Sequence, residues 1–141
     1  MGVLLGLDLG EKRVGVAVTD EMGMLATPLL TLEYVGKKKF VVDLSKLIAE
    51  YNVEKIIVGL PKTLKGEMGP AAQKISAQVG WFKTQVQIPW IFWDERLTSA
   101  EVERVLIDAD VSREKRKDIR DRLAAQRILQ NYLDFQRHSQ A

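Results

Sequence analysis

The first third of the chain alternates short apolar runs with turn residues, a pattern typical of β-strands. Val3–Asp8 is apolar almost throughout, as expected of a strand covered on both faces. Val14–Thr19 is rich in β-branched residues, and Ala26–Leu32 follows a second turn at Asp20–Gly23. These segments predict three strands that form an antiparallel meander.

Beyond residue 36 the apolar spacing becomes helical, and helices then alternate with short apolar runs. The spacing predicts a helix over Lys37–Tyr51. The later segments predict strands at Lys55–Gly59 and Ile88–Trp93, and helices starting at Pro70, spanning Thr98–Ala109 and spanning Asp118–Phe135. The order predicts an α/β fold with a mixed five-stranded sheet, in which the meander joins parallel strands and helices flank the sheet.

Length and composition narrow the class of protein. A chain of 141 residues predicts one domain over 1–141, and 46% hydrophobic with 28% charged residues excludes a disordered chain. The absence of cysteine excludes a disulfide scaffold, a thiol nucleophile and an iron–sulfur cluster. With a single histidine, His138, a Ser-His-Asp triad is hard to build, so oxygen ligands and a hard cation such as Mg²⁺ or Mn²⁺ are favoured. No apolar run reaches membrane length and no signal-peptide layout is present, so we expect a soluble cytoplasmic protein.

Charge is unevenly distributed along the chain. The net charge is +2, but residues 113–127 hold seven basic and three acidic side chains, a net of +4. This basic segment predicts an edge that binds a polyanion. The alternative is a solvated helix in which arginines pair with aspartates.

Acidic residues stand at the ends of predicted strands. Asp8 closes an apolar strand, where an ionised carboxylate needs a partner or a metal, and Asp94 and Glu95 follow the fifth strand in the same way. Asp121 lies in the first turn of the last predicted helix, on the same face as Ala125. Small alanines at 124 and 125 would let this helix approach the sheet closely.

Three converging carboxylates without a histidine repel one another unless one takes a proton or a divalent cation joins them. Such a set is suited to one or two magnesium ions, which activate water and stabilise the leaving oxygen in phosphodiester cleavage. Each acid also has a structural interpretation. Asp8 could cap the following turn, Glu95 could pair with Arg96, and Asp121 could suit a helix N-terminus.

Five blocks of the sequence, spread over essentially the whole chain, resemble the YqgF/RuvX family. The blocks are Leu7–Gly10, Arg13–Ala17, Ile57–Pro61, Asp94–Thr98, and Asp121 with the helix that follows it. The resemblance implies a ribonuclease H-like fold and a pre-16S ribosomal RNA nuclease, a homologue of Holliday-junction resolvases. Carried over by position, the catalytic and metal-binding acids fall on Asp8, Glu95 and Asp121. One departure from the related RuvC resolvases is that the fourth strand ends in Gly59-Leu60-Pro61, with no acid there.

Other residues are candidates for nucleic-acid contacts. Lys62 and Lys65 lie in a glycine-containing loop that either holds a phosphate backbone or is merely solvated, and Arg96 could steer the scissile phosphate or hold Glu95. In the basic segment the candidates are Arg113, Lys115, Arg116 and Lys117. Trp90 and Trp93 are expected to be core residues rather than base-stacking platforms.

Two other function classes compete with a nuclease. An Asp-x-Gly after a strand also opens the phosphate-binding fold of actin, hexokinase and Hsp70, but those proteins need two such domains. The other rival is a non-catalytic nucleic-acid-binding module. We expect a metal-dependent nuclease acting on structured nucleic acid at the 5′ end of pre-16S rRNA, with branched DNA as the alternative substrate. The expected partners are pre-rRNA and ribosomal precursor particles, with no membrane, and the chain is a monomer or homodimer.

Overall fold

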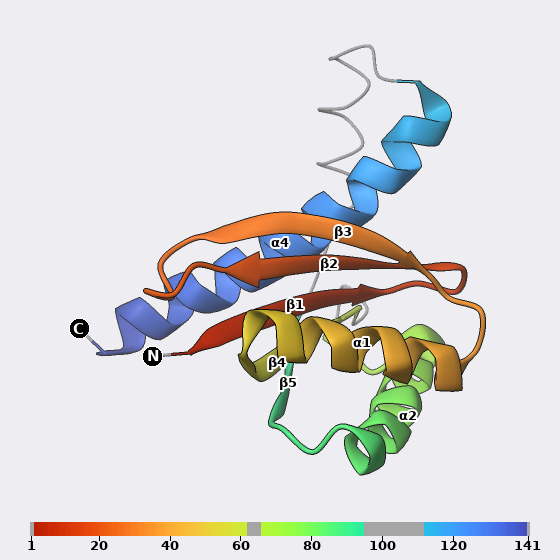
Figure 1. Ribbon diagram of the computed structural model, residues 1–141, viewed down its shortest axis with the longest axis horizontal. Helices are drawn as coiled ribbons and strands as arrows, with labels where there is room; N and C mark the ends of the chain where they lie inside the picture. Colours follow the sequence, from red (N-terminus) through yellow and green to blue (C-terminus); the bar gives the residue numbers. More distant parts are fainter. Residues whose placement is uncertain (1, 62–65, 95–111, 141) are drawn as a thin grey trace.

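The structure, a computed structural model, describes residues 2–61, 66–94 and 112–140. Its centre is a five-stranded sheet of order β3-β2-β1-β4-β5 (Figure 1). The strands are β1 (Val3–Leu9), β2 (Arg13–Thr19), β3 (Ala26–Glu33), β4 (Val53–Leu60) and β5 (Trp90–Asp94). The pairs β1–β2 and β2–β3 are antiparallel, whereas β1–β4 and β4–β5 are parallel. The predicted meander and mixed sheet are therefore confirmed.

Helices cover both faces of the sheet (Figure 1). Helices α1 (Lys37–Tyr51) and α2 (Pro70–Gln85) lie on one face, and α4 (Arg113–Gln140) crosses the other. The predicted bounds of α1 and the start of α2 at Pro70 are confirmed. The helix predicted over Thr98–Ala109 lies outside the described residues. Among the described helices, none is long and apolar enough to cross a membrane.

Some predicted boundaries were wrong. β4 starts at Val53, before the predicted Lys55, and β5 starts at Trp90 rather than Ile88. Pro89 has no N–H to donate to a ladder, although its carbonyl accepts a hydrogen bond from Ile56 N at 2.9 Å.

The last helix also differs from its prediction, because it begins at Arg113 rather than Asp118. Its first residues are helix-forming Arg, Glu and Lys, but they carry no apolar spacing that would have revealed a helix. Asp121 therefore lies in the third turn of α4, not in the first. The structural interpretation of Asp121 as a residue suited to a helix N-terminus is therefore wrong, because the stabilisation of an acid by the helix dipole fades beyond the first turn.

The larger core fills the space between the sheet and helices α1 and α2. Phe40 and Phe82 meet at its centre with ring centroids 5.0 Å apart, and Trp90 stacks on Phe82 at 5.9 Å. Trp90 is buried, and its indole N–H donates to the Val86 carbonyl at 3.0 Å. Its predicted place in the core is confirmed, and Trp93 is partly buried on the opposite face of the sheet.

The second core lies under α4, which packs unusually close to the sheet. Ala124 and Ala125 are buried as predicted, and the strands contribute glycines where the helix crosses. A Cβ at Gly6 would lie 2.8 Å from Leu129 Cβ, and one at Gly15 would overlap the Asp121 carbonyl oxygen. Small residues on both elements thus allow α4 to lie directly on β1 and β2.

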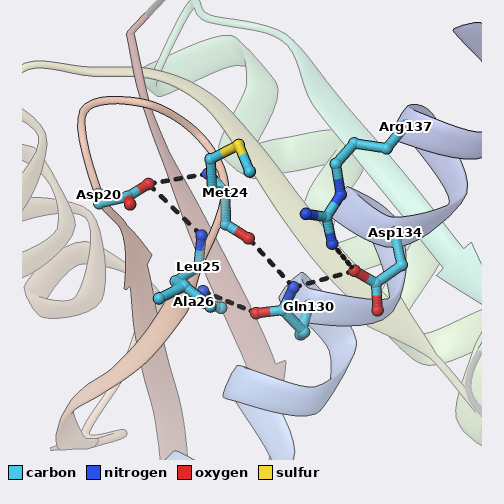
Figure 2. A network of polar contacts seen from close by, with 7 residues as sticks. All are labelled: Asp20, Met24, Leu25, Ala26, Gln130, Asp134 and Arg137. Atoms are coloured by element: carbon cyan, nitrogen blue, oxygen red, sulfur yellow. Dashed lines mark hydrogen bonds and ion pairs between the residues drawn. The ribbon is translucent and has the colours of Figure 1, made fainter.

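A polar network holds the C-terminal half of α4 to the β2–β3 turn (Figure 2). Gln130 accepts a hydrogen bond from Ala26 N at 2.9 Å and donates to the Met24 carbonyl at 3.3 Å. Gln126 donates to the Ala26 carbonyl at 3.1 Å, so both backbone groups of Ala26 are satisfied by α4. These contacts fix the position of α4 along the sheet. They thereby determine which part of β1 lies beside the third turn of the helix.

Candidate active site

Strand β1 presents Asp8 to helix α4. Leu5 and Leu7 belong to the core under α1 and α2, whereas Gly6 contacts α4. Because side chains alternate along a strand, Asp8 lies on the same face as Gly6, toward α4. The β1–β2 turn beside it is closed by a backbone hydrogen bond from Gly10 N to the Arg13 carbonyl, at 2.9 Å.

Helix α4 brings Asp121 to the same place, between two arginines. Arg13 Nε donates to Asp121 Oδ2 at 2.8 Å, and Arg120 Nε lies 4.0 Å from Asp121 Oδ1. The Asp121 side chain is only 15% exposed, which confirms that it faces the body of the protein. The two guanidinium groups place positive charge beside this carboxylate, and the hydrogen bond from Arg13 limits its rotation.

The charges of the two aspartates act on each other. Burial, followed by the nearby negative charge of Asp121, raises the pKa of Asp8 from 3.8 to about 6, and Arg120 opposes this rise. Two carboxylates from different elements are thus held close in a partly desolvated position. A divalent cation would relieve their repulsion, so the donor set of hard oxygens fits such an ion.

The third predicted acid, Glu95, lies outside the described residues, as do Lys62, Lys65 and Arg96. Its neighbour Asp94 ends β5 and is exposed. Within residues 2–61, 66–94 and 112–140, no group of three acidic or histidine side chains is arranged to hold a metal.

The basic segment extends from the same helix. The N-terminal turns of α4 project beyond the sheet (Figure 1). A hydrogen bond from Thr31 Oγ1 to the Asp118 carbonyl, at 3.0 Å, joins the helix to β3 where it reaches the sheet. Arg113 begins the helix, Lys115 and Lys117 are exposed, and Arg116 is half-buried.

The alternative of arginine–aspartate pairing in this segment also finds support. Arg122 Nη2 lies 3.2 Å from Asp118 Oδ2, one turn apart on the helix. This pair neutralises part of the segment locally, but it leaves the exposed lysines 115 and 117 on the projecting turns.

Sequence reasoning missed three residues of the site. Arg13, Gly15 and Arg120 contact Asp121 and position it, yet no pattern in the sequence marked them for that role. The one indication in the sequence was that Arg13 and Gly15 belong to the block Arg13–Ala17, which resembles the YqgF/RuvX family. The close approach of helix and strand that explains the glycine exists only in three dimensions.

Comparisons with known proteins agree over almost the whole chain. A family described as "RuvX: Holliday junction resolvase" matches residues 2–135. A protein of Thermoanaerobacter pseudethanolicus is 48% identical over 136 residues, covering 96% of this chain and 98% of the relative. One from Clostridioides difficile is 47% identical over 138 residues, with 98% of each covered. Both are named "Putative pre-16S rRNA nuclease".

Solved structures share the fold at low sequence identity. Thermus thermophilus RuvC, in complex with a Holliday junction substrate, aligns with a TM-score of 0.52 and 14% identity, covering 93% of each chain. The Fowlpox virus resolvase, in complex with Holliday junction DNA, aligns with a TM-score of 0.55 and 13% identity, covering 94% of this chain and 97% of the other. The predicted ribonuclease H-like fold is confirmed.

Proposed function

This chain belongs to the RuvX family, and from that premise we propose that it is a nuclease that hydrolyses phosphodiester bonds in pre-16S rRNA, at the 5′ end of the precursor. The observation that carries the proposal is the pairing of Asp8 with Asp121. Two carboxylates from β1 and α4 lie close enough for the charge of one to raise the pKa of the other. We further propose that residues 1–141 act as one nuclease domain in the cytoplasm.

Asp8, Asp121 and Glu95 are the residues proposed to hold Mg²⁺ or Mn²⁺. When bound at such a site, the ion lowers the pKa of a water molecule and stabilises charge on the leaving oxygen. The chain's own contribution is geometric and electrostatic. Arg13 orients the Asp121 carboxylate from β2, and Arg120 counters the raised pKa of Asp8, which favours the ionised form that a cation needs.

Binding of the RNA backbone is assigned to cations around this pair. The projecting turns of α4 carry Arg113, Lys115, Arg116 and Lys117, in the helix that also carries Asp121. A backbone bound along these turns would lead toward the carboxylates. Lys62, Lys65 and Arg96 are proposed to act with them, in segments outside the described residues.

The second candidate function is resolution of branched DNA, which the description of the matching family favours. The end of β4 differs from the corresponding position in the RuvC resolvases, because Gly59, Leu60 and Pro61 supply no carboxylate there. We therefore favour RNA processing.

Cleavage assays on purified variants test the proposal. Asp8→Asn, Glu95→Gln and Asp121→Asn should each lower the rate of Mg²⁺-dependent cleavage of a pre-16S rRNA 5′ fragment by orders of magnitude. Asp94→Asn, beside Glu95 in sequence, is the matched control and should retain activity. A four-way DNA junction of equal length serves as the competing substrate.

Three results would each count against part of this proposal. Undiminished cleavage by any of the three acid variants would remove that acid from the site. Faster cleavage of the junction than of the RNA would favour the resolvase function. Binding of the RNA without any cleavage by the wild type would favour a non-catalytic module.

A further inference from the structure

A cavity of about 310 Å³ opens on the α1 and α2 face of the sheet, where β1 and β4 end. Leu9 at the end of β1, Pro61 just after β4 and Ile75 on α2 form apolar walls. Tyr34 adds an aromatic wall, and its ring is held by Phe40 with centroids 5.7 Å apart. The volume is at the lower end of the range of about 300–1,000 Å³ found for small-ligand sites.

Polar groups surround the apolar walls. Lys74, Gln78 and Glu11 line the same cavity, and Lys74 Nζ lies 3.7 Å from Glu11 Oε1. The Lys74 side chain is 60% exposed and that of Glu11 is 84% exposed. Their ion pair is therefore weak and can open at little cost in free energy. The rim therefore offers a cation, a carboxylate acceptor and an amide that both donates and accepts.

The cavity and the two aspartates lie back to back across the end of β1. Asp8 and Leu9 are consecutive, and consecutive side chains of a strand point to opposite faces of the sheet. Asp8 faces α4, whereas Leu9 lines the cavity. A strand of nucleic acid that passes over this end of the sheet would meet both.

We propose that this cavity binds the base of an unpaired nucleotide adjacent to the cleaved phosphodiester bond. The inference rests on the proposed nuclease function and extends it to the recognition of the substrate. A heteroaromatic base suits an apolar cavity with one aromatic wall, and its edge suits groups that donate and accept hydrogen bonds. Lys74 is placed for the attached phosphate. Free inorganic phosphate has no base to fill the apolar cavity, so it would gain only the contact with Lys74, which competes with Glu11.

Nucleotide binding without metal tests this inference separately from cleavage. The four ribonucleoside 5′-monophosphates and inorganic phosphate are titrated into the full chain in EDTA, and amide chemical shifts are followed by NMR. Ala71, which is exposed on α2 and lines the cavity, is replaced in Ala71→Trp to fill it. Ala77, exposed on the same helix and outside the lining, provides the matched control Ala77→Trp. Lys74→Gln supplies a second variant at an exposed position.

At least one monophosphate should bind and shift the amides of Leu9, Gly10 and Tyr34. Ala71→Trp should weaken this binding by about tenfold or more and Ala77→Trp by less than about twofold, while Lys74→Gln weakens monophosphate binding by about threefold or more. Equal affinity of the two tryptophan variants, unchanged affinity of Lys74→Gln, or the same shifts with inorganic phosphate would each overturn the inference.

The outcome is distinguishable from that of the proposed function. RNA cleavage that persists without monophosphate binding would remove the cavity inference alone. Monophosphate binding at the cavity in a protein that cleaves no RNA would contradict the proposed nuclease while leaving a nucleotide site in place.

Discussion

The backbones of Gly15 on β2 and Asp121 on α4 lie in direct contact, with no room for a Cβ on residue 15. In the sheet, Gly15 is the register partner of Asp8. Gly15 therefore sets the distance between α4, which carries Asp121, and β2, the strand paired with the one that carries Asp8. Arg13, two residues earlier on β2, then fixes the orientation of the Asp121 side chain.

Gly15→Ala should displace α4 from the sheet. Overpacking of this kind costs about 1–3 kcal/mol, and a shift of the order of 1 Å at an active site can cost about 100-fold in rate. Urea denaturation and the cleavage rate are the measurements. Gly80→Ala is the matched control, because Gly80 is exposed on α2 and a Cβ there meets nothing within 4 Å. If Gly15→Ala matched this control in both stability and rate, the close contact would have no functional role.

The pKa of Asp8 should respond in opposite directions to its two charged neighbours. In metal-free wild type, the titration of the Asp8 carboxyl carbon, followed by NMR, should have a midpoint of about 6. Asp121→Asn should lower this midpoint by removing a like charge, and Arg120→Gln should raise it. Arg127→Gln, exposed farther along α4, should leave it unchanged. A common midpoint in all four proteins would show that burial alone sets the pKa.

The same raised pKa predicts how metal-free stability depends on pH. Because the folded pKa of about 6 lies above 3.8, the folded state binds this proton more tightly. The stabilising contribution is present below about pH 4, falls as pH rises to about 6, and is absent at neutral pH. The rise in the pKa of Asp8 from 3.8 to about 6 corresponds to about 3 kcal/mol in the free energy of unfolding, at about 1.4 kcal/mol per pKa unit.

Asp8→Asn should therefore raise the free energy of unfolding at pH 7 in EDTA by up to about 3 kcal/mol, and by almost nothing at pH 4. Mg²⁺ should stabilise the wild type more than the variant. Glu50→Gln, at an exposed position of α1, is the control and should change stability by less than about 0.5 kcal/mol. A lower stability of Asp8→Asn at pH 7 would indicate a structural hydrogen bond at Asp8 instead.

Phosphate binding by the projecting turns of α4 should appear in the salt dependence of RNA binding. Replacing both Lys115 and Lys117 with Gln should lower the log–log slope by about 0.7–0.9 for each lysine that binds a phosphate in the wild type, equally for different sequences. Lys38 and Lys46 are exposed on α1, and the same double change there provides a control of equal charge. Identical slopes for the two double variants would leave the basic segment as a solvated helix end.

Much of the fold could be predicted because local sequence patterns determine where most of its helices and strands lie. The apolar spacing of α1 and the proline at the start of α2 fixed those boundaries, and alternation of turns with β-branched runs predicted the meander. The early start of α4 was missed because its first turns project beyond the sheet and bury no apolar face. Local spacing is informative only where an element packs on a core.

Two acids of the candidate site could be singled out from the sequence, whereas the residues that support them could not. Asp8 stood out as a charge closing an apolar strand, and Asp121 as an acid on an apolar helix face. The roles of Gly15, Arg13 and the glutamine contacts to Ala26 depend on how α4 lies across the sheet. Pairings between residues about 100 positions apart leave no periodic trace in one sequence.

Asp8, Glu95 and Asp121 are proposed to share a divalent cation. A crystal of the protein soaked in Mn²⁺, with anomalous diffraction recorded at the manganese edge, tests this proposal most directly. We predict an anomalous peak coordinated by oxygens of all three carboxylates, and its loss in crystals of Asp121→Asn. Manganese bound elsewhere, with Asp8 and Asp121 free of it in a protein that still cleaves RNA, would contradict a metal site shared by the three acids.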